Sequence, residues 1–388
     1  MRGRADDQPV MFHVFDVEDR IRADHPLRDV KRRADRLLAG LSPQFAAAYS
    51  RTGRPSVPPE RLLKALLLMA LYSVRSERQL CDRLATDLLF RWFLDLQPSD
   101  EVFDHAVFSH NRARLDEHDL TKRFFDSVVA EALAADLCSD HFTVDGTLIE
   151  SFASAKSFQP KGPAAGPDAG GGPPEGGANG FKPRNAAVDF RGKKRTNETH
   201  ESRTDPEARL YRKSAGQEAK LSHIGHALTE NRHGLLVGVA VTEANGTAER
   251  AAALDLADEL TATHRRRPAT LGADKGYDCG EFFQAVEARG IEPHVPLVKD
   301  PRDPADVPYH KQRAGVEARQ RMKGRQDGDG YRLSQKCRKK VEEVFGWLKE
   351  VGRLGRSRVV GRWKIQQLLE VGGAAYNLIR LRKLAPAG

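Results

Sequence analysis

The hydrophobic pattern of the chain changes at residue 141, and no other feature limits the possible folds as strongly. Upstream of that point the pattern is helical: residues 59–72 combine strong helix formers with a proline near the first turn. Downstream, short apolar strands alternate with helices, which is typical of an α/β domain. We therefore predict an α/β core, residues 136–388, preceded by an all-helical N-terminal domain, residues 1–135.

Three helical segments lie close together in the N-terminal part. After residues 59–72, Ser76 and Gln79 have the spacing of a capping box and predict the start of a second helix. The third segment, residues 88–96, is rich in aromatic residues. A helix, a tight turn and a second helix are compatible with a helix-turn-helix that reads DNA. A bundle for packing or dimerisation fits the same pattern equally well.

The core is predicted to consist of short elements. A strand over residues 142–145 is expected to end in a carboxylate, with Gly146 as the turn and an extended segment at 147–149. Residues 301–330 predict a polar loop. Further strands are expected at 221–229, 235–242, 269–274 and 290–296, and helices at 247–263, 281–289, 338–350 and 364–384.

Residues 160–180 interrupt the core with a stretch of unusual composition. They hold 8 Gly and 5 Pro and contain no Val, Ile, Leu or aromatic residue. Because such a stretch cannot bury apolar surface, it is predicted to be a flexible insertion.

Positive charge is concentrated toward the C-terminus. The formal net charge of the chain is +9, yet residues 311–388 alone hold 20 Lys and Arg against 7 Asp and Glu. Clustered cations displace the counterions condensed on phosphate, so this region predicts a polyanionic partner such as a nucleic acid. The alternative is a solvated, salt-bridged surface, which is the commoner meaning of a single charge run.

The pattern also argues against several protein classes. The longest apolar run, residues 62–74, contains Lys64 and is shorter than the ~18 residues of a membrane span, so no membrane partner is expected. Residues 1–7 carry charges without a following apolar run, so no secretory signal is expected. The four cysteines form no Cys-x-x-Cys pair, which disfavours a disulfide framework or a zinc ribbon and favours a cytoplasmic location.

Two aspartates are candidates for metal binding. Asp145 and Asp274 each follow a predicted strand, with glycine one or two positions further on. Carboxylates at neighbouring strand ends of an α/β sheet are suited to one hard cation, and Mg²⁺ takes one or two carboxylates plus substrate phosphates. Taken alone the two are a weak indication, because aspartate after a strand is also an ordinary turn residue.

The predicted helix over residues 338–350 has a distinct polar border. Four apolar residues form one stripe, and Arg338, Glu342 and Lys349 fall within about 40° of one another along its edge. Glu343 points about 100° further round, toward solvent. A surface Arg–Glu pair accounts for this arrangement. A third metal ligand between two phosphate-binding cations accounts for it as well.

Taken together, these segments resemble the bacterial insertion-sequence transposases of the DDE class, in the group around insertion sequences four and five. The family's last motif is Tyr, two residues, Arg, three residues, Glu, six residues and Lys. Arg338, Glu342 and Lys349 occupy its last three places, and Gln335 stands where the family has tyrosine. Besides the helical N-terminal region, the resemblance rests on residues 143–149, 191–200, 271–277 and 341–349.

The resemblance implies a ribonuclease-H-like fold and a DNA transposase that cleaves the ends of its element and joins them to target DNA. Asp145, Asp274 and Glu342 are then the catalytic residues and the ligands of two Mg²⁺ ions ~3.5–4 Å apart, with Mn²⁺ as a substitute. Double-stranded DNA, a homodimer or larger assembly on that DNA, and association with the nucleoid are implied too. Two alternatives stay open: an inactive DNA-binding relative that acts as a regulator, and a metal-dependent nuclease that does not join strands.

Five basic residues are candidates for DNA contacts. The resemblance implies that Arg338 and Lys349 contact phosphates near the cleaved strand. Lys193, Lys194 and Arg195 are expected to line the DNA path near the active site. A charged loop that anchors the flexible insertion explains the same three residues nearly as well.

Two histidines stand close together in a predicted strand. His223 and His226 are three residues apart, so their side chains are expected on opposite faces. We interpret them as surface or DNA-facing residues and do not expect a zinc site.

Overall fold

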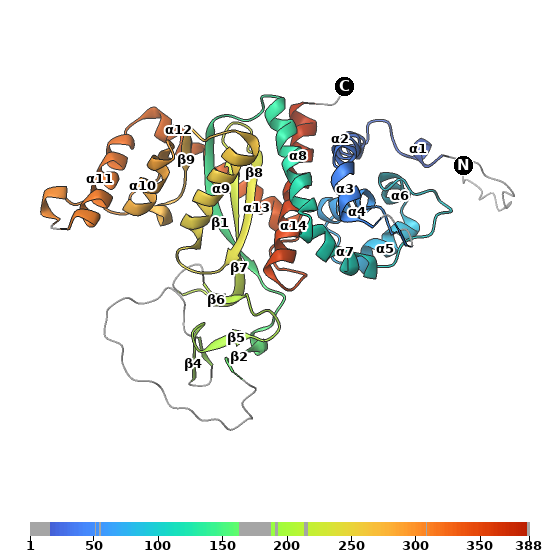
Figure 1. Ribbon diagram of the computed structural model, residues 1–388, viewed down its shortest axis with the longest axis horizontal. Helices are drawn as coiled ribbons and strands as arrows, with labels where there is room; N and C mark the ends of the chain where they lie inside the picture. The colour runs from blue at the N-terminus through green and yellow to red at the C-terminus, as the bar shows by residue number, and fades with distance from the viewer. Residues whose placement is uncertain are drawn as a thin grey trace, which may run out of the picture.

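The N-terminal part of the protein is helical, as predicted, and lies to one side of the sheet in Figure 1. The computed structural model describes residues 16–50, 52–53, 56–162, 188–190, 193–212, 216–307 and 309–385. Most of the predicted insertion at 160–180 lies outside these residues, as do residues 1–7, where no secretory signal is expected. The helices of this part are α1 (Val17–Arg20), α2 (Leu27–Gly40), α3 (Ser42–Ala48), α4 (Pro59–Leu71), α5 (Glu77–Thr86), α6 (Leu88–Phe93), α7 (Ala106–Glu117) and α8 (Leu120–Ala134).

Helices α4 and α5 form for the reasons visible in their residues. Helix α4 begins at Pro59, and 10 of its 13 residues are buried. At the start of α5, Ser76 Oγ accepts a hydrogen bond from the Gln79 N–H at 3.1 Å, and the Gln79 side chain accepts one from the Arg75 N–H at 3.0 Å. These bonds satisfy backbone donors that the first turn of a helix leaves unpaired, so the predicted cap is present.

The core is a mixed sheet covered by helices. The strands of the whole core are β1 (His141–Glu150), β2 (Phe158–Pro160), β3 (Val188–Phe190), β4 (Lys193–Arg195), β5 (His200–Ser202), β6 (Arg209–Tyr211), β7 (Lys220–Glu230), β8 (Leu236–Glu243), β9 (Thr270–Gly272) and β10 (Glu292–His294). Its helices are α9 (Ala248–His264), α10 (Gly280–Ala288), α11 (His310–Arg325), α12 (Asp329–Cys337), α13 (Lys339–Glu350) and α14 (Arg362–Leu384).

The main sheet has six strands in the order β10-β9-β1-β7-β6, with β8 also paired to β7. Strand β9 is parallel to both β1 and β10, whereas β7 is antiparallel to β1, β6 and β8. The short strands β2, β4 and β5 lie below the main sheet in Figure 1. A helical region followed by a mixed α/β core confirms the predicted fold class.

Strand β1 does not end at Asp145. It pairs with β7 without interruption from Phe142 to Glu150. The predicted turn at Gly146 is therefore wrong, because this glycine lies inside the strand. An Asp-Gly pair favours a turn when it is considered locally. Here the long pairing with β7 keeps the backbone extended.

Helices cover both faces of the sheet. On one face Leu256 of α9 lies against Gly238 of β8, and on the other Leu369 of α14 lies against Gly225 of β7. Helix α13 packs against β1, β7 and α14. Asp145 is paired with Ala227 of β7, which lies two residues from Gly225. Because side chains alternate between the two faces along a strand, these positions share one face of the sheet. Asp145 therefore points to the face that carries α14.

Residues 301–330 are not the loop that the sequence predicts. Helix α11 fills much of this stretch, and α12 begins at its end. The stretch has few apolar residues, so no clear helical stripe is visible in its sequence. The helix is instead stabilised by tertiary contacts: Ala318 and Met322 are fully buried, and Arg319 Nε lies 2.8 Å from Asp278 Oδ1.

Helices α8 and α14 join the helical region to the sheet, and Figure 1 shows them between the two. Phe125 of α8 is fully buried, and both its ring and Leu236 of β8 lie against Gly373 of α14. One hydrophobic core therefore continues from the N-terminal helices through α14 into the sheet. No helix in the described part of the chain is long and apolar enough to cross a membrane.

A buried carboxyl group lies where α8 and α14 meet. Glu370 is 5 % exposed and accepts hydrogen bonds from Thr121 Oγ1 at 2.6 Å and from Gln366 Nε2 at 2.9 Å. Burial raises the pKa of Glu370 from 4.5 to about 7, and the nearby charge of Asp126 adds to this while Lys122 opposes it. The folded protein therefore keeps a proton that the unfolded chain releases.

This proton makes the stability of the fold depend on pH. The folded state binds more protons than the unfolded state between the two pKa values, so the Glu370 contribution to the free energy of unfolding falls as pH rises from 4.5 through about 7. The full loss is about 3 kcal/mol. Glu370→Gln is expected to remove this part of the pH dependence, as measured by urea unfolding at about pH 5 and about pH 8. An unchanged slope in the variant would contradict the prediction.

Candidate active site

Asp145 and Asp274 lie at equivalent positions on neighbouring parallel strands. Thr143 of β1 is paired with Gly272 of β9, and each aspartate follows two residues later. Since parallel strands run in the same direction, both carboxylates lie at the same end of β9. The backbone therefore places the two aspartates next to each other at this end of β9, although β1 itself continues past Asp145.

Backbone groups orient both carboxylates. Asp145 Oδ1 accepts a hydrogen bond from the Gly146 N–H at 2.8 Å. Strand β9 ends at Gly272, two residues earlier than predicted, and Asp274 caps the 3₁₀ turn that follows. Asp274 Oδ1 accepts a hydrogen bond from the Gly276 N–H at 2.7 Å. Neither side chain is buried, so both remain accessible to a ligand.

The edge of β1 beside Asp145 is open. Pairing with β9 stops at Thr143, although β1 continues to Glu150. The next backbone contact on this edge among the described residues is the bridge between Glu150 and Arg356. Asp145 lies between these two contacts, where no described strand pairs with this edge of β1.

Tyr277 lies in the 3₁₀ turn that Asp274 caps. Its side chain is 0 % exposed, its ring packs 5.4 Å from that of Phe282, and its hydroxyl has no hydrogen-bond partner among the described residues. Burial raises the pKa of Tyr277 well above its usual value, and the negative charges of Glu249, Asp145 and Asp274 add to this effect. The charges of three carboxylates from three different elements therefore act on one buried hydroxyl.

Helix α13 runs alongside β1. At its start, Lys340 donates a hydrogen bond to the carbonyl of Asn231, whose N–H donates to the His141 carbonyl at 2.9 Å. Beyond its end, the Gly355 carbonyl accepts the N–H of Glu150 at 3.1 Å. The helix therefore follows the strand from its first residue to its last, and it lies with α14 on the face to which Asp145 points.

The polar border of α13 carries Glu342 as predicted. Glu342 Oε1 lies 3.3 Å from Arg338 Nη2, and the Glu342 side chain is 56 % exposed. Glu343 is exposed too, but its charge acts on Tyr376 of α14, whose pKa is raised mainly by burial. The two glutamates therefore face different surroundings. The predicted apolar stripe is buried, which confirms that part of the prediction: Val341, Val344, Phe345 and Leu348.

The side chains do not converge fully on one point. No group of three His, Cys, Asp or Glu residues in the described ranges lies close enough to hold a metal ion as the side chains stand. The donor set nevertheless fits a hard divalent cation, because carboxylate oxygens are its preferred ligands. The unpaired hydroxyl of Tyr277 beside these carboxylates also fits a site that a ligand completes.

Comparison with protein families gives two matches. Residues 15–114 match the family Transposase domain (DUF772), and residues 195–378 match the family Transposase DDE domain. The chain belongs to the DDE transposases of insertion sequences. The second match contains Asp274 and Glu342, whereas Asp145 lies upstream of it. Comparisons with curated proteins and with solved structures gave no match.

The family assignment confirms the predicted resemblance and indicates the general function of the protein. The protein is a DNA transposase, and members of its family bind DNA and generally use divalent metal ions. The assignment is compatible with the predicted group around insertion sequences four and five, which stays a prediction. The helical region and the α/β core with its mixed sheet are consistent with a ribonuclease-H-like transposase domain.

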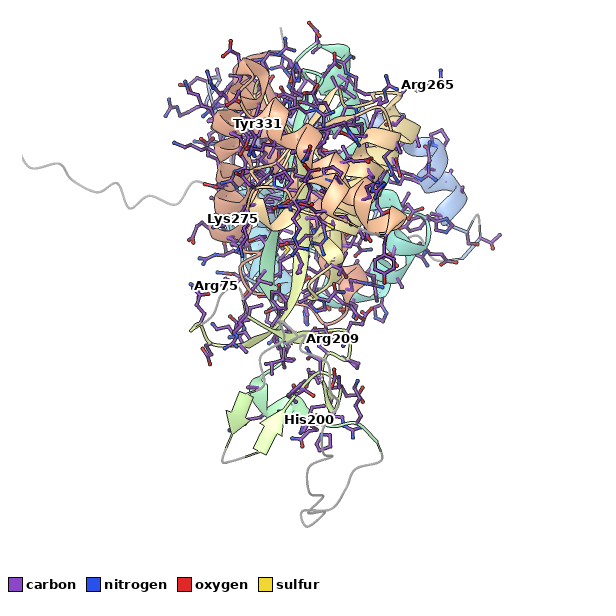
Figure 2. The ribbon with its side chains drawn as sticks, turned by 90° about the vertical axis from the view of Figure 1, so that its left-hand side faces the viewer. Arg75, His200, Arg209, Arg265, Lys275 and Tyr331 are labelled. Atoms are coloured by element: carbon purple, nitrogen blue, oxygen red, sulfur yellow. The ribbon has the colours of Figure 1, made fainter. Side chains whose placement is uncertain are left out.

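The basic segment 193–195 of the transposase forms strand β4, so it is not a loop. Arg195 Nη1 donates to the Phe158 carbonyl at 3.5 Å, and the side chains of Lys193 and Lys194 lie outside the described part. Figure 2 shows His200, five residues on, at the lower end of the molecule and Lys275, beside Asp274, about half-way up. The predicted role of these cations on the DNA path stays a prediction.

His223 and His226 of the transposase are not surface residues. Both side chains are 0 % exposed. His223 Nε2 lies 2.9 Å from Asp205 Oδ2, and His226 Nε2 lies 2.7 Å from Thr242 Oγ1. Burial lowers the pKa of His226 to about 4, so it is neutral. The surface interpretation is wrong because β7 lies inside the sheet, although pairing does place the two histidines on opposite faces as predicted.

Two residues near the site were not identified from the sequence. Tyr277 lies in the stretch 271–277 that supported the resemblance, yet nothing there shows that its hydroxyl is buried. Glu249 looks like an ordinary acidic residue in the first turn of a helix, where it interacts favourably with the helix dipole. Only the packing of α9 against the sheet brings it to the site.

Proposed function

We propose that this transposase cleaves the ends of its insertion sequence and joins them to target DNA by metal-dependent phosphoryl transfer. The observation that carries the proposal is the register of β1 and β9, which sets Asp145 and Asp274 side by side at an open strand edge. Helix α13 runs alongside with Glu342 on its polar border. We assign these three carboxylates as the metal ligands.

Mg²⁺ is the proposed ion, with Mn²⁺ as a substitute and two ions in each site. Such ions activate the attacking oxygen and stabilise the leaving oxygen of an in-line displacement at phosphorus. The chain itself supplies the oxygen donors and holds them in place. Asp145 is fixed by a paired strand and Asp274 by the turn it caps, so each carboxylate is oriented before DNA arrives.

Arg338 and Lys349 are proposed to hold phosphates of the cleaved strand, since Arg338 is the N-cap residue of the helix that carries Glu342 and Lys349 lies in its last turn. Lys193, Lys194 and Arg195 are proposed to contact the DNA further along its path. Cations placed along one face neutralise phosphates and release counterions, which supports binding without regard to base sequence.

The helical region contacts the segment of the core that follows α13. Ser73, in the turn between α4 and α5, donates a hydrogen bond to the Val351 carbonyl at 2.8 Å, and Arg358 donates to the Val74 carbonyl. The next residue, Arg75, is exposed and lies on the same side of the molecule as Lys275 in Figure 2. We propose that residues 1–135 bind the element end or mediate dimerisation, and that two or more copies act together on DNA.

A strand-cleavage assay tests the proposed function. The full-length protein is incubated with the DNA that flanks its own gene, with Mg²⁺ or Mn²⁺ or with EDTA. We expect nicks at the element ends only when the metal is present, because the carboxylates act through it. Asp145→Asn is expected to bind the same DNA and leave it intact. Binding without cleavage by both proteins, or cleavage in EDTA, would overturn the proposal.

A further inference from the structure

A fourth acidic residue, Glu249, lies directly over the strand that carries Asp145. A side-chain carbon placed on Gly146 would lie 2.8 Å from Glu249 Oε1 and 3.1 Å from its Cγ. At these distances a side chain at position 146 would require the flexible end of Glu249 to move, so the Glu249 carboxylate occupies the space that such a side chain would fill. Helix α9 thus delivers this carboxylate to the residue next to Asp145.

The glycine at position 146 is explained by this approach and not by the backbone. Gly146 lies in a paired strand opposite His226 and is not among the glycines of positive φ. Glycine inside a strand weakens the strand, and it commonly marks a place where another group approaches closely. Here the approaching group is the Glu249 side chain.

Capping of α9 does not account for the position of Glu249. Asn245 Oδ1 accepts hydrogen bonds from the N-cap residue Thr247 at 2.9 Å and from Ala248, the first residue of the helix, at 2.7 Å. The Glu249 carboxylate is instead directed to the sheet, against Gly146.

Tyr277 provides an independent sign that this cluster takes a ligand. Its side chain is fully buried, its hydroxyl has no hydrogen-bond partner in the described part of the chain, and the charges of Glu249, Asp145 and Asp274 add to the burial that raises its pKa. A buried hydroxyl left without a hydrogen bond costs free energy. Movement of one carboxylate toward the hydroxyl would satisfy it, and a cation would favour that movement by removing the repulsion between the carboxylates.

We propose that Glu249 is a fourth carboxylate of the metal centre, admitted by Gly146, with Tyr277 as a positioning residue. The proposal rests on the proposed function and extends its ligand set from three residues to four. Oxygen donors then come from the sheet, from the turn after β9 and from helices on both faces. A bound cation would draw them together at the open edge of β1, where no described strand lies between them.

Metal binding to the full-length protein tests the proposal without reference to catalysis. Free Mn²⁺ is measured by electron paramagnetic resonance during titration of the wild type and of Glu249→Gln. The variant is expected to bind Mn²⁺ about 10–100-fold more weakly, because one anionic donor is lost while size is kept. Asp255→Asn is the matched control, since Asp255 is an exposed carboxylate on the same helix. It is expected to bind as the wild type does.

Two further variants separate the possible outcomes. Gly146→Ala is expected to weaken Mn²⁺ binding as Glu249→Gln does, because the new methyl group displaces the Glu249 carboxylate. Wild-type binding by Glu249→Gln, together with lost binding by Asp145→Asn, would overturn the assignment of Glu249 alone. Wild-type binding by Asp145→Asn would overturn the proposed metal centre itself. Thermal melting of each variant verifies that the fold is kept.

Discussion

Glu342→Gln is expected to abolish strand cleavage, a loss of about 10³-fold or more, while DNA binding is kept. The amide matches the carboxylate in size but carries no charge, so it cannot stabilise a divalent ion in the same way. Glu342 lies on the exposed border of α13, so its replacement leaves the buried stripe of that helix intact. Cleavage of the flanking DNA and a gel-shift titration of the same fragment measure the two effects separately.

Glu343→Gln is the matched control for this prediction. It makes the same chemical change one residue further along the same helix, also at an exposed position. Its charge acts on Tyr376 of α14, whereas Glu342 pairs with Arg338. We expect cleavage close to that of the wild type. Equal loss of activity in both variants would contradict the assignment of Glu342, because charge on the helix as a whole would then explain the effect.

Phe125→Ala is expected to lower the free energy of unfolding by about 3–5 kcal/mol. The ring is fully buried between α8 and α14 and lies against Gly373, so its removal leaves a cavity that the helix backbone cannot easily fill. Since one core continues through this contact, we expect the helical region and the sheet to unfold in one transition that moves to lower denaturant. Circular dichroism during urea unfolding measures both features.

Phe152→Ala is the control for the loss of a phenyl ring. Phe152 is 55 % exposed, so its truncation removes the same atoms without opening a cavity. A surface change of this kind is expected to alter stability by no more than about 0.5 kcal/mol. Two separate transitions in the wild type, with only the first shifted in Phe125→Ala, would show that the helical region folds independently and would contradict the prediction.

The parts of this fold that the sequence predicted well are those decided by neighbouring residues. The cap at Ser76, the stripe on α13 and the strands β7 and β8 follow from residues within one or two turns or one strand. Local propensity and hydrophobic period are sufficient for such features. The equivalent placement of Asp145 and Asp274 depends in addition on the pairing of β1 with β9, which lie far apart in the chain.

The predictions that the structure contradicts share a different cause. Gly146 was expected in a turn, and residues 301–330 were expected as a loop, because both were considered without their partners. Pairing with β7 keeps the first extended, and packing of α11 with ion pairs such as Arg319–Asp278 makes the second helical. The burial of His223 likewise follows from its strand lying inside the sheet. Contacts between distant residues decided all three.

The amino-acid sequence by itself determined the class of fold, the family and the three carboxylates proposed as metal ligands. The class of fold rests on local periodicity, whereas the family and the three carboxylates rest on the resemblance of short motifs to those of known transposases. The tertiary structure alone decided that no described strand pairs with β1 beside Asp145, that the buried Tyr277 hydroxyl has no hydrogen-bond partner among the described residues, and that Glu249 lies over Gly146. The physical reason is that each of these facts depends on the packing of elements far apart in the chain, which no local pattern records.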